Sequence, residues 1–186
     1  MNFRSPFLIG LMLTVVSGVA RAETSGPLEA QLQRWDGTSA RISAYRGKPT
    51  VVFYEDRGSR EVNRRLKNEL LERGQRRGLM NAANVVAVAN LNAYDFFPAR
   101  QFAKKAIRDV ENQVKIPVLI DWKCALTTSP WNLPPKNSTI LLLDASGRAV
   151  FERTGTLSAE EIEDLFQRLD NLLGIRPEEH GLKAQR

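Results

Sequence analysis

Residues 49–71 read PTVVFYEDRGSREVNRRLKNELL, and this stretch decides the fold. Within it, residues 51–54 (VVFY) form an unbroken apolar run of strand-forming side chains, which is typical of a strand covered on both faces. Residues 55–59 (EDRGS) follow with turn chemistry, and Asp56 or Ser59 can cap a helix that starts there. The first half of the stretch therefore predicts a buried strand that ends in a tight polar turn.

The second half of the stretch predicts a helix. Val62, Leu66 and Leu70 recur every four residues and give one apolar stripe among charged side chains. In an open parallel sheet, ligands bind just past the carboxyl ends of the strands, so the turn at 55–59 is the first place to look for a site. Glu55 is followed there by a second carboxylate, but neighbours at a strand end point to opposite sides, which disfavours an acid–base pair.

The composition limits the available chemistry. The 186 residues suit a single domain with a core of ordinary size. Cys124 is the one cysteine, so no internal disulfide can form, and His180 is the one histidine and lies in a polar tail. A histidine-based zinc site is therefore excluded, and a Ser-His-Asp triad would need the tail to fold back. We predict no cofactor and no metal, and we favour a protein that is not an enzyme.

The N-terminus has the pattern of a secretory signal peptide. Arg4 gives a basic start, residues 6–16 are almost wholly apolar, and Ala20-Arg21-Ala22 is a small-x-small cleavage pattern. A single membrane anchor is the alternative, but the apolar run is shorter than the ~20 residues that a span needs. We therefore predict a signal peptide at 1–22 and a periplasmic or secreted mature chain without a stable membrane span. Cleavage lowers the formal charge from +6 to +4, because two arginines leave.

The rest of the chain alternates strand and helix patterns. Residues 28–35 and 40–42 alternate around Asp36-Gly37 and predict a hairpin. Four more strands are expected from apolar runs, at 84–91, 116–120, 138–143 and 149–153. Pro117 lies near the start of one of them and suggests a strand at the sheet edge.

Two further helices follow from apolar periodicity and capping signals. Pro98 opens the first, whose apolar face is expected to be Phe102, Ala106, Val110 and Val114. Ser158 and Glu161 form a capping box at the start of the last helix, with Leu157 and Ile162 as a hydrophobic staple. This last helix is expected to end before Gly174 and to bury Ile162, Leu165, Phe166, Leu169 and Leu173.

This order of elements predicts an α/β protein with a central mixed sheet, an N-terminal β-hairpin and helices on both faces of the sheet. One domain is expected at 23–175, followed by a polar C-terminal tail at 176–186. No internal repeat and no second domain is visible in the sequence.

Three pieces of the chain resemble the exported, TlpA/ResA-type version of the thioredoxin-like fold. They are WDGTSARISAYRGKPTVVFYE (35–55), IPVLIDWK (116–123) and STILLLDASGRAVFERTGTLSAEEIEDLFQRL (138–169). The last piece is the most specific, and the resemblance covers nearly all of residues 28–173. The whole chain also resembles the YtfJ group, whose members are exported thioredoxin-like proteins without the dithiol.

The chain departs from the thioredoxin pattern at the reactive turn. The resemblance places the Cys-x-x-Cys motif at about Gly58 to Glu61, where no sulfur is present, and Ser138 takes the place of the conserved cis-proline. Dithiol–disulfide exchange needs an attacking and a resolving thiol, so the usual reductase or isomerase activity is not supported. We predict a redox-inactive binding or adaptor module of the cell envelope. The alternative is a single-cysteine oxidoreductase or peroxiredoxin-like activity that uses Cys124.

Cys124 and the basic cluster each have two interpretations. Cys124, helped by Lys123, is either a lone reactive thiol or a small side chain packed under the loop that contains it. Arg57 and Arg60 begin a basic cluster that includes Arg64, Arg65 and Lys67. With the helix N-terminus, they either form an anion site or belong to a solvated face balanced by glutamates.

The loop after the strand at 116–120 completes the predicted site. Trp122 and Trp131 in this Pro-rich loop either form an apolar surface for a partner or close the domain's own core. The predicted docking edge consists of Asp56, Arg57, Ser59, Arg60, Trp122, Trp131 and Ser138. Its expected partner is a protein or an anionic envelope ligand, and not nucleic acid, because no aromatics interleave the basic residues. The sequence leaves the oligomeric state open.

Overall fold

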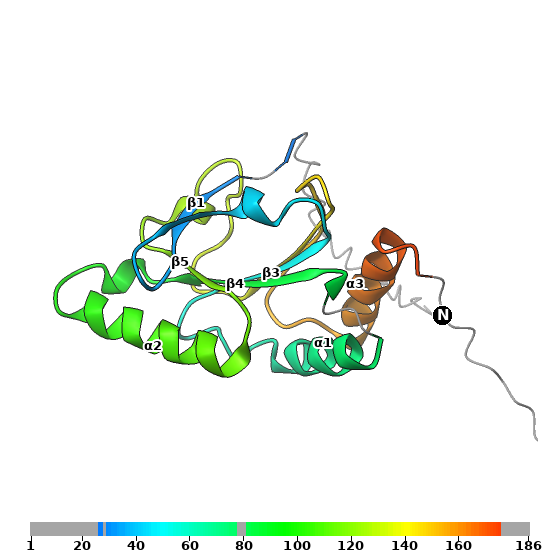
Figure 1. Cartoon of the computed structure of the whole chain (residues 1–186), viewed down its shortest axis with the longest axis horizontal. Helices are drawn as coiled ribbons and strands as arrows, with labels where there is room; N and C mark the ends of the chain where they lie inside the picture. The colour runs from blue at the N-terminus through cyan, green and yellow to red at the C-terminus, as the bar shows by residue number, and fades with distance from the viewer. Residues whose placement is uncertain (1–25, 28, 78–80, 176–186) are drawn as a thin grey trace, which may run out of the picture.

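The computed structural model describes residues 26–27, 29–77 and 81–175. The predicted signal peptide and the C-terminal tail lie outside the described residues. Within the described residues, one mixed sheet has the strand order β2-β1-β5-β4-β3-β6-β7 (Figure 1). The strands are β1 (Gln31–Gln33), β2 (Ser39–Arg41), β3 (Thr50–Glu55), β4 (Asn84–Asn90), β5 (Val118–Asp121), β6 (Thr139–Leu143) and β7 (Ala149–Thr154). The thioredoxin-like α/β fold with its N-terminal hairpin is thus confirmed.

The three central strands β3, β4 and β5 are parallel, and β6 pairs with β3 in the antiparallel direction. β3 is fully buried along its length, as its continuous apolar run predicts. β5 lies between β4 and β1, so the prediction of an edge strand is wrong. The reason is that Pro117 precedes the strand, where its missing N–H is not needed, and its carbonyl still accepts a hydrogen bond from the Ala87 N–H.

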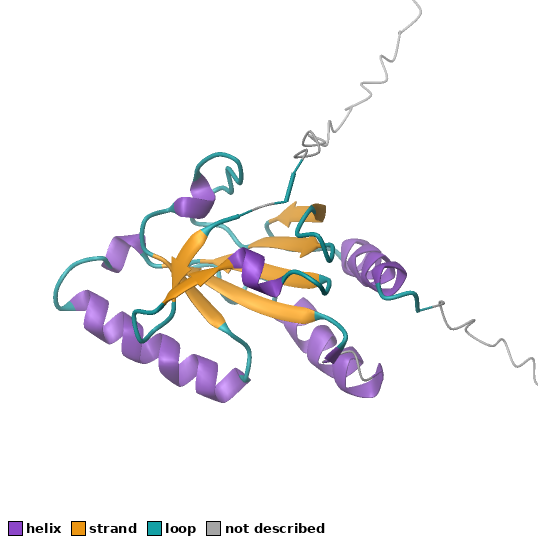
Figure 2. Ribbon diagram, turned by 45° about the horizontal axis from the view of Figure 1, so that its top comes forward, coloured by secondary structure: helices purple, strands orange, loops and turns teal. Residues whose placement is uncertain are grey.

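Three α-helices and three short 3-10 helices connect these strands within the described residues. The α-helices are α1 (Arg64–Arg77), α2 (Ala99–Val114) and α3 (Ala159–Leu172), and the 3-10 helices are η1 (Ile42–Tyr45), η3 (Asn92–Tyr94) and η4 (Ala125–Thr127). All three α-helices cover the same face of the sheet, so the expectation of helices on both faces is wrong (Figures 1 and 2). The chain moves from β3 to β4 to β5 in one direction, and right-handed crossovers then place α1 and α2 on one side.

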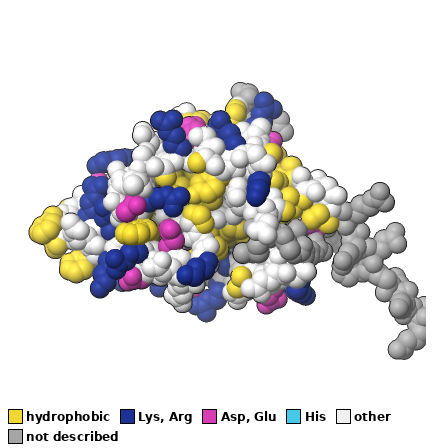
Figure 3. All heavy atoms as spheres, viewed as in Figure 1, with side chains coloured by type: hydrophobic (Ala, Val, Ile, Leu, Met, Phe, Trp, Pro, Cys, Tyr) yellow, Lys and Arg dark blue, Asp and Glu magenta, His cyan; other side chains and the backbone are white. Residues whose placement is uncertain are grey.

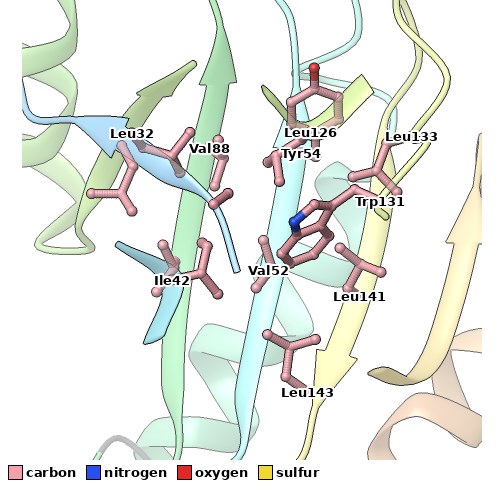
Figure 4. Packing of buried hydrophobic residues seen from close by; sticks show 13 residues of the cluster. Leu32, Ile42, Val52, Tyr54, Val88, Leu126, Trp131, Leu133, Leu141 and Leu143 are labelled. Atoms are coloured by element: carbon pink, nitrogen blue, oxygen red, sulfur yellow. The ribbon is translucent and has the colours of Figure 1, made fainter. Parts of the chain in front are cut away.

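The two faces of the sheet carry separate cores. On the helical face, Val51, Phe53 and Ile140 pack against α1 and α3. On the opposite face, side chains of the hairpin and of the loop after β5 cover the sheet, among them Leu32, Ile42, Leu126, Trp131 and Leu133 (Figure 4). The N-terminal hairpin and the loop after β5 thus cover the face of the sheet that was predicted to be covered by helices.

The α3 prediction is confirmed for its capping box and for Ile162, Leu165, Phe166 and Leu169, whereas Leu173 follows the helix and is only half-buried. Ser158 and Glu161 form the capping box, with both reciprocal hydrogen bonds present. Leu157 and Ile162, the two members of the staple, are both buried in the core under α1 and α3. The helix ends ahead of Gly174, as expected.

The buried face of α1 differs from the prediction. Residues 57–63 form turns, and the α-helix begins only at Arg64. Hydrogen bonds from Val62 N–H to the Ser59 carbonyl and from Arg64 N–H to the Glu61 carbonyl give these turns 3-10 spacing. The tighter winding rotates Val62 to the surface and Asn63 into the interior.

The apolar face of α2 also differs from the prediction, because the stripe from Phe102 to Val114 is exposed. The sheet-facing side instead contains Ala103 and Ile107, which pack near Ile120 and Trp122. α2 therefore sits on the sheet through a different face from the one that its hydrophobic periodicity predicts.

Candidate functional site

The turn after β3 is held closed by two of its own side chains. The Asp56 Oδ1 atom accepts hydrogen bonds from the Ser59 N–H at 2.8 Å and from the Ser59 hydroxyl at 2.9 Å. The Asp56 N–H donates back to the Ser59 Oγ at 3.0 Å. This reciprocal pattern fixes the turn where a thioredoxin carries its dithiol. Asp56 is half-buried and Ser59 is buried, so the Ser59 hydroxyl is used within the turn.

Glu55 lies beneath this turn at the end of β3, with 8 % of its surface exposed. Its Oε1 accepts a hydrogen bond from the Ser138 hydroxyl at 2.8 Å, and its Oε2 is 2.6 Å from the Lys67 Nζ. Burial raises the pKa of the Glu55 carboxyl, and this effect outweighs the lowering by Lys67 and Ser138. Local sequence patterns give no signal for this carboxylate, because its partners come from other elements.

Asn63 connects three segments that are distant in the sequence. Its amide Nδ2 donates to the Ser138 Oγ and to the Gly155 carbonyl, both at 2.9 Å. Its Oδ1 accepts from the Leu157 N–H at 2.9 Å. Glu55, Ser138 and Asn63 thus form a buried chain of hydrogen bonds that joins β3, the start of β6 and the turn before α3. Polar groups in such a chain are largely satisfied by one another.

The basic cluster is mostly paired with glutamates. Exposed ion pairs join Arg60 and Arg64 to Glu61, at 3.5 and 2.9 Å. Further along α1, Arg65 and Arg73 pair with Glu69. This arrangement favours the interpretation as a solvated, balanced face. Arg57 is exposed and has no ion-pair partner among the described residues, which leaves it as the free cation of the predicted docking edge.

The two tryptophans of the loop after β5 belong to the interior. Trp122 is 4 % exposed and Trp131 is 1 % exposed, and the Trp131 Nε1 donates to the Glu29 carbonyl at 2.8 Å. Figure 4 shows Trp131 packed beside Leu133 and Leu141. The hypothesis that they form an apolar docking surface is therefore wrong, and the alternative, a lid over the domain's own core, is correct. Trp122 packs with Ala103 and Ile107 of α2, whereas Trp131 packs with the hairpin on the opposite face, which no α-helix among the described residues covers.

Cys124 lies in the first turn of this loop, half-buried, with a left-handed backbone at φ +57°. The turn is organised by the buried Asp121, whose carboxylate accepts from the N–H groups of Lys123, Ala125 and Leu126 at 3.2, 2.8 and 3.0 Å. The sequence signal for this role of Asp121 is an Asp that ends a strand and precedes a short helical turn, a pattern that was not used to predict the site.

Tyr54, in β3, is a buried residue with a phenol hydroxyl. Its phenol oxygen accepts a hydrogen bond from the Asn90 Nδ2 at 2.7 Å. Burial, and then the negative charges of Asp121 and of a Cys124 thiolate, raise the pKa of Tyr54.

Among the described residues, no three His, Cys, Asp or Glu side chains gather into a group suited to a metal ion. The chemistry that the site offers is therefore hydrogen bonding, ion pairing and one thiol.

The fold and this edge define a thioredoxin-like protein whose reactive turn contains hydrogen-bonded polar side chains in place of sulfur. The chain belongs to the family described as bacterial protein of unknown function (YtfJ_HI0045), whose model matches residues 29–172. No curated protein matches the sequence.

Solved structures with the same fold include several whose descriptions refer to thiol-redox proteins. A protein of Chlorobium tepidum, described as a candidate thiol:disulfide interchange protein DsbE, is 15 % identical, with a TM-score of 0.57 over 82 % of this chain and 99 % of its own. A DsbF homologue of Corynebacterium diphtheriae is 16 % identical, with a TM-score of 0.56 over 77 % and 86 %. A peroxiredoxin-like protein of Aquifex aeolicus is 13 % identical, with a TM-score of 0.51 over 77 % and 86 %. At these identities the likeness shows the fold alone.

Proposed function

We propose that the protein is an exported, redox-inactive thioredoxin-like module that works by binding in the cell envelope. The observation that carries this proposal is the chain of hydrogen bonds from Glu55 through Ser138 to Asn63. These side chains lie beneath the turn that carries the dithiol in redox enzymes of this fold. They are hydrogen-bonded to one another. A site of this kind supports the turn rigidly and contains no group prepared for disulfide exchange.

Export is the second part of the proposal and is supported by the basic and apolar pattern of residues 1–22. No helix among the described residues is long and apolar enough to cross a membrane. Expression of the full sequence with a C-terminal tag, followed by fractionation and N-terminal sequencing, tests this part. A periplasmic product that begins near Glu23 is expected, and an uncleaved product in the cytosol would refute it.

The proposed binding partner is a protein or an anionic ligand that contacts the exposed end of the docking edge. Ser59, Trp122, Trp131 and Ser138 are buried and Asp56 is half-buried, so Arg57 and Arg60 are the exposed members of the docking edge. Envelope proteins that co-purify with the wild type should be lost with the double variant Arg57→Glu/Arg60→Glu. The matched control, Arg65→Glu/Arg76→Glu, makes the same change of charge further along α1 and should keep them. Equal losses in both variants would show that net charge, and not this edge, is responsible.

A single-thiol oxidoreductase is the second candidate, because Cys124 is half-exposed and not sealed in the core. In such an enzyme the Cys124 thiolate would attack a substrate disulfide, release one thiolate and form a mixed disulfide that an external thiol resolves. Maleimide labelling of the native and the denatured protein separates the two candidates. Slow native labelling and no insulin reduction above a Cys124→Ser control are expected. Rapid native labelling with turnover that Cys124→Ser abolishes would establish the enzyme.

A further inference from the structure

An apolar row runs along the solvent side of α2. It consists of Phe102, Ala106, Val110 and Val114, spaced four residues apart, and all four are exposed. The exposed fractions of the phenylalanine and the two valines are 69 %, 39 % and 46 %. At 1.5 Å per residue the row is ~18 Å long. Phe96 and Phe97 extend it before the helix begins, with 60 % and 84 % exposed. Figure 3 shows apolar side chains protruding at the end of the molecule where α2 begins.

The helix turns this row outward because its other side is occupied by specific contacts. Arg100 stacks over the Trp122 ring at 4.7 Å and donates to Gln33 and Asp95. Glu111 accepts a hydrogen bond from the Val118 N–H at 3.0 Å, which caps the start of β5. These polar contacts fix the rotation of α2 about its axis. The most apolar side of the helix is therefore left without a partner within the described chain.

The exposed area is large for a soluble monomer. A phenylalanine side chain can bury on the order of 200 Å², so three that are 60 %, 69 % and 84 % exposed leave roughly 400 Å² of aromatic surface in water. The valines and the alanine add to this. Contiguous apolar patches of about 300–600 Å² are at the upper limit for monomers and are often interaction sites.

The charges beside the row indicate what covers it. Lys105 and Asp109 follow one another along its exposed flank, and Asp109 has only an exposed contact of 3.6 Å with Arg108. The first half of α2 (99–106) carries the basic residues Arg100, Lys104 and Lys105, and the second half (107–114) carries Arg108, Asp109 and Glu111, so the formal charges of the halves are +3 and −1. Two copies of such a helix attract each other when they lie antiparallel and repel each other when they lie parallel.

We propose that α2 is the interface of a two-fold symmetric dimer in which two copies of α2 pack antiparallel. Phe102 of one copy then lies against Val114 of the second copy, and Ala106 lies against Val110. Lys105 and Asp109 pair reciprocally across the flank. The small side chain of Ala106 lets the helices approach, and a row with four-residue spacing is the ridge used in the commonest class of helix packing.

This partner fits better than an anionic membrane. The acidic Asp109 lies within the exposed flank of the row, so a negatively charged surface would be repelled at that position. A second copy instead supplies the opposite charge at each position. With on the order of 500 Å² from each copy, the interface is at the small end of specific contacts, so the dimer should dissociate on dilution.

Sedimentation velocity of the full chain over a range of concentrations tests the proposal. The wild type should shift from monomer to dimer with increasing concentration. Phe102→Glu should raise the dissociation constant about 100-fold or more, because the substitution occurs twice in a symmetric dimer. Leu71→Glu, which alters a leucine on α1 that is 50 % exposed, is the matched control and should leave the dissociation constant unchanged.

A charge exchange tests the antiparallel orientation. Lys105→Asp and Asp109→Lys should each weaken the dimer, and the double variant Lys105→Asp/Asp109→Lys should restore it, since both reciprocal pairs re-form. A monomeric wild type at every concentration, equal effects of Phe102→Glu and Leu71→Glu, or a double variant weaker than both single variants would overturn the proposal. Tight binding of monomers to phosphatidylglycerol vesicles, lost in Phe102→Glu, would also overturn it in favour of a lipid surface.

Discussion

Ser138 donates a hydrogen bond of 2.8 Å to Glu55, although 83 positions separate the two residues in the sequence. The bond joins the start of β6 to the carboxyl end of β3, the two strands that flank the reactive turn in thioredoxin-like proteins. Lys67 closes the other side of the same carboxylate. The contact therefore supports the turn from below, and with Lys67 it gives both oxygens of the Glu55 carboxylate a partner.

The stability of this edge should depend strongly on Asn63. Replacing it with alanine removes one acceptor and two donor contacts at a buried position and leaves the Leu157 N–H and the Gly155 carbonyl without their partner. We expect Asn63→Ala to lower the free energy of unfolding by about 2–4 kcal/mol, measured by urea denaturation. The exposed Asn112→Ala should change it by less than about 0.5 kcal/mol. Equal effects of the two substitutions would show that the buried chain of hydrogen bonds does not stabilise the fold.

Glu55 should make the protein less stable as the pH rises. A carboxyl whose pKa is higher in the folded than in the unfolded state binds protons preferentially in the folded state. The free energy of unfolding therefore falls as the pH rises above about 4.5, the ordinary pKa of a glutamate. Glu55→Gln removes this dependence. The stability of the Gln variant relative to the wild type should therefore increase between pH 4.5 and 7, with a slope of at most about 1.4 kcal/mol per pH unit.

Glu61 provides a control with the opposite sign. A hydrogen bond from Arg64 is the main cause that lowers the pKa of this exposed carboxyl. Its contribution to stability is present above its ordinary pKa and is lost as the pH falls. Glu61→Gln should thus become less stable relative to the wild type as the pH rises, whereas Glu55→Gln becomes more stable. Parallel pH profiles for the two variants would contradict the assignment of the Glu55 shift to burial.

The elements that were predictable from the sequence are those with local causes. The apolar run of β3 and the capping box of α3 specify their own structures, because the interactions involved lie within a few residues. The start of α1 was not predictable, because the turns before it have 3-10 spacing. As a result Asn63 is buried and Val62, which was predicted to be buried, is exposed. The amide of Asn63 can be buried there only because Ser138, Gly155 and Leu157 meet it, and no local pattern encodes those contacts.

The orientation of α2 was also not predictable from the sequence. Its periodicity correctly predicts a helix and an apolar row, but the row faces water because Arg100 and Glu111 make the contacts that fix the rotation. Hydrophobic periodicity identifies which residues belong together on one face. It does not identify whether the sheet or another molecule covers that face.

The two buried tryptophans of the loop after β5 should differ in what their ring nitrogens contribute. The Trp131 Nε1 donates to the Glu29 carbonyl, whereas the Trp122 Nε1 is buried with no hydrogen-bond partner among the described residues. Replacement with phenylalanine reduces the ring size at both sites, so both variants lose packing. Only Trp131→Phe also removes a hydrogen bond, and we expect it to lose about 1 kcal/mol more than Trp122→Phe in urea denaturation. Because this bond joins the loop to the segment before β1, the larger loss should be accompanied by faster proteolysis within residues 122–135. Equal losses would mean that the loop is held by packing alone and that its lid function needs no contact with Glu29.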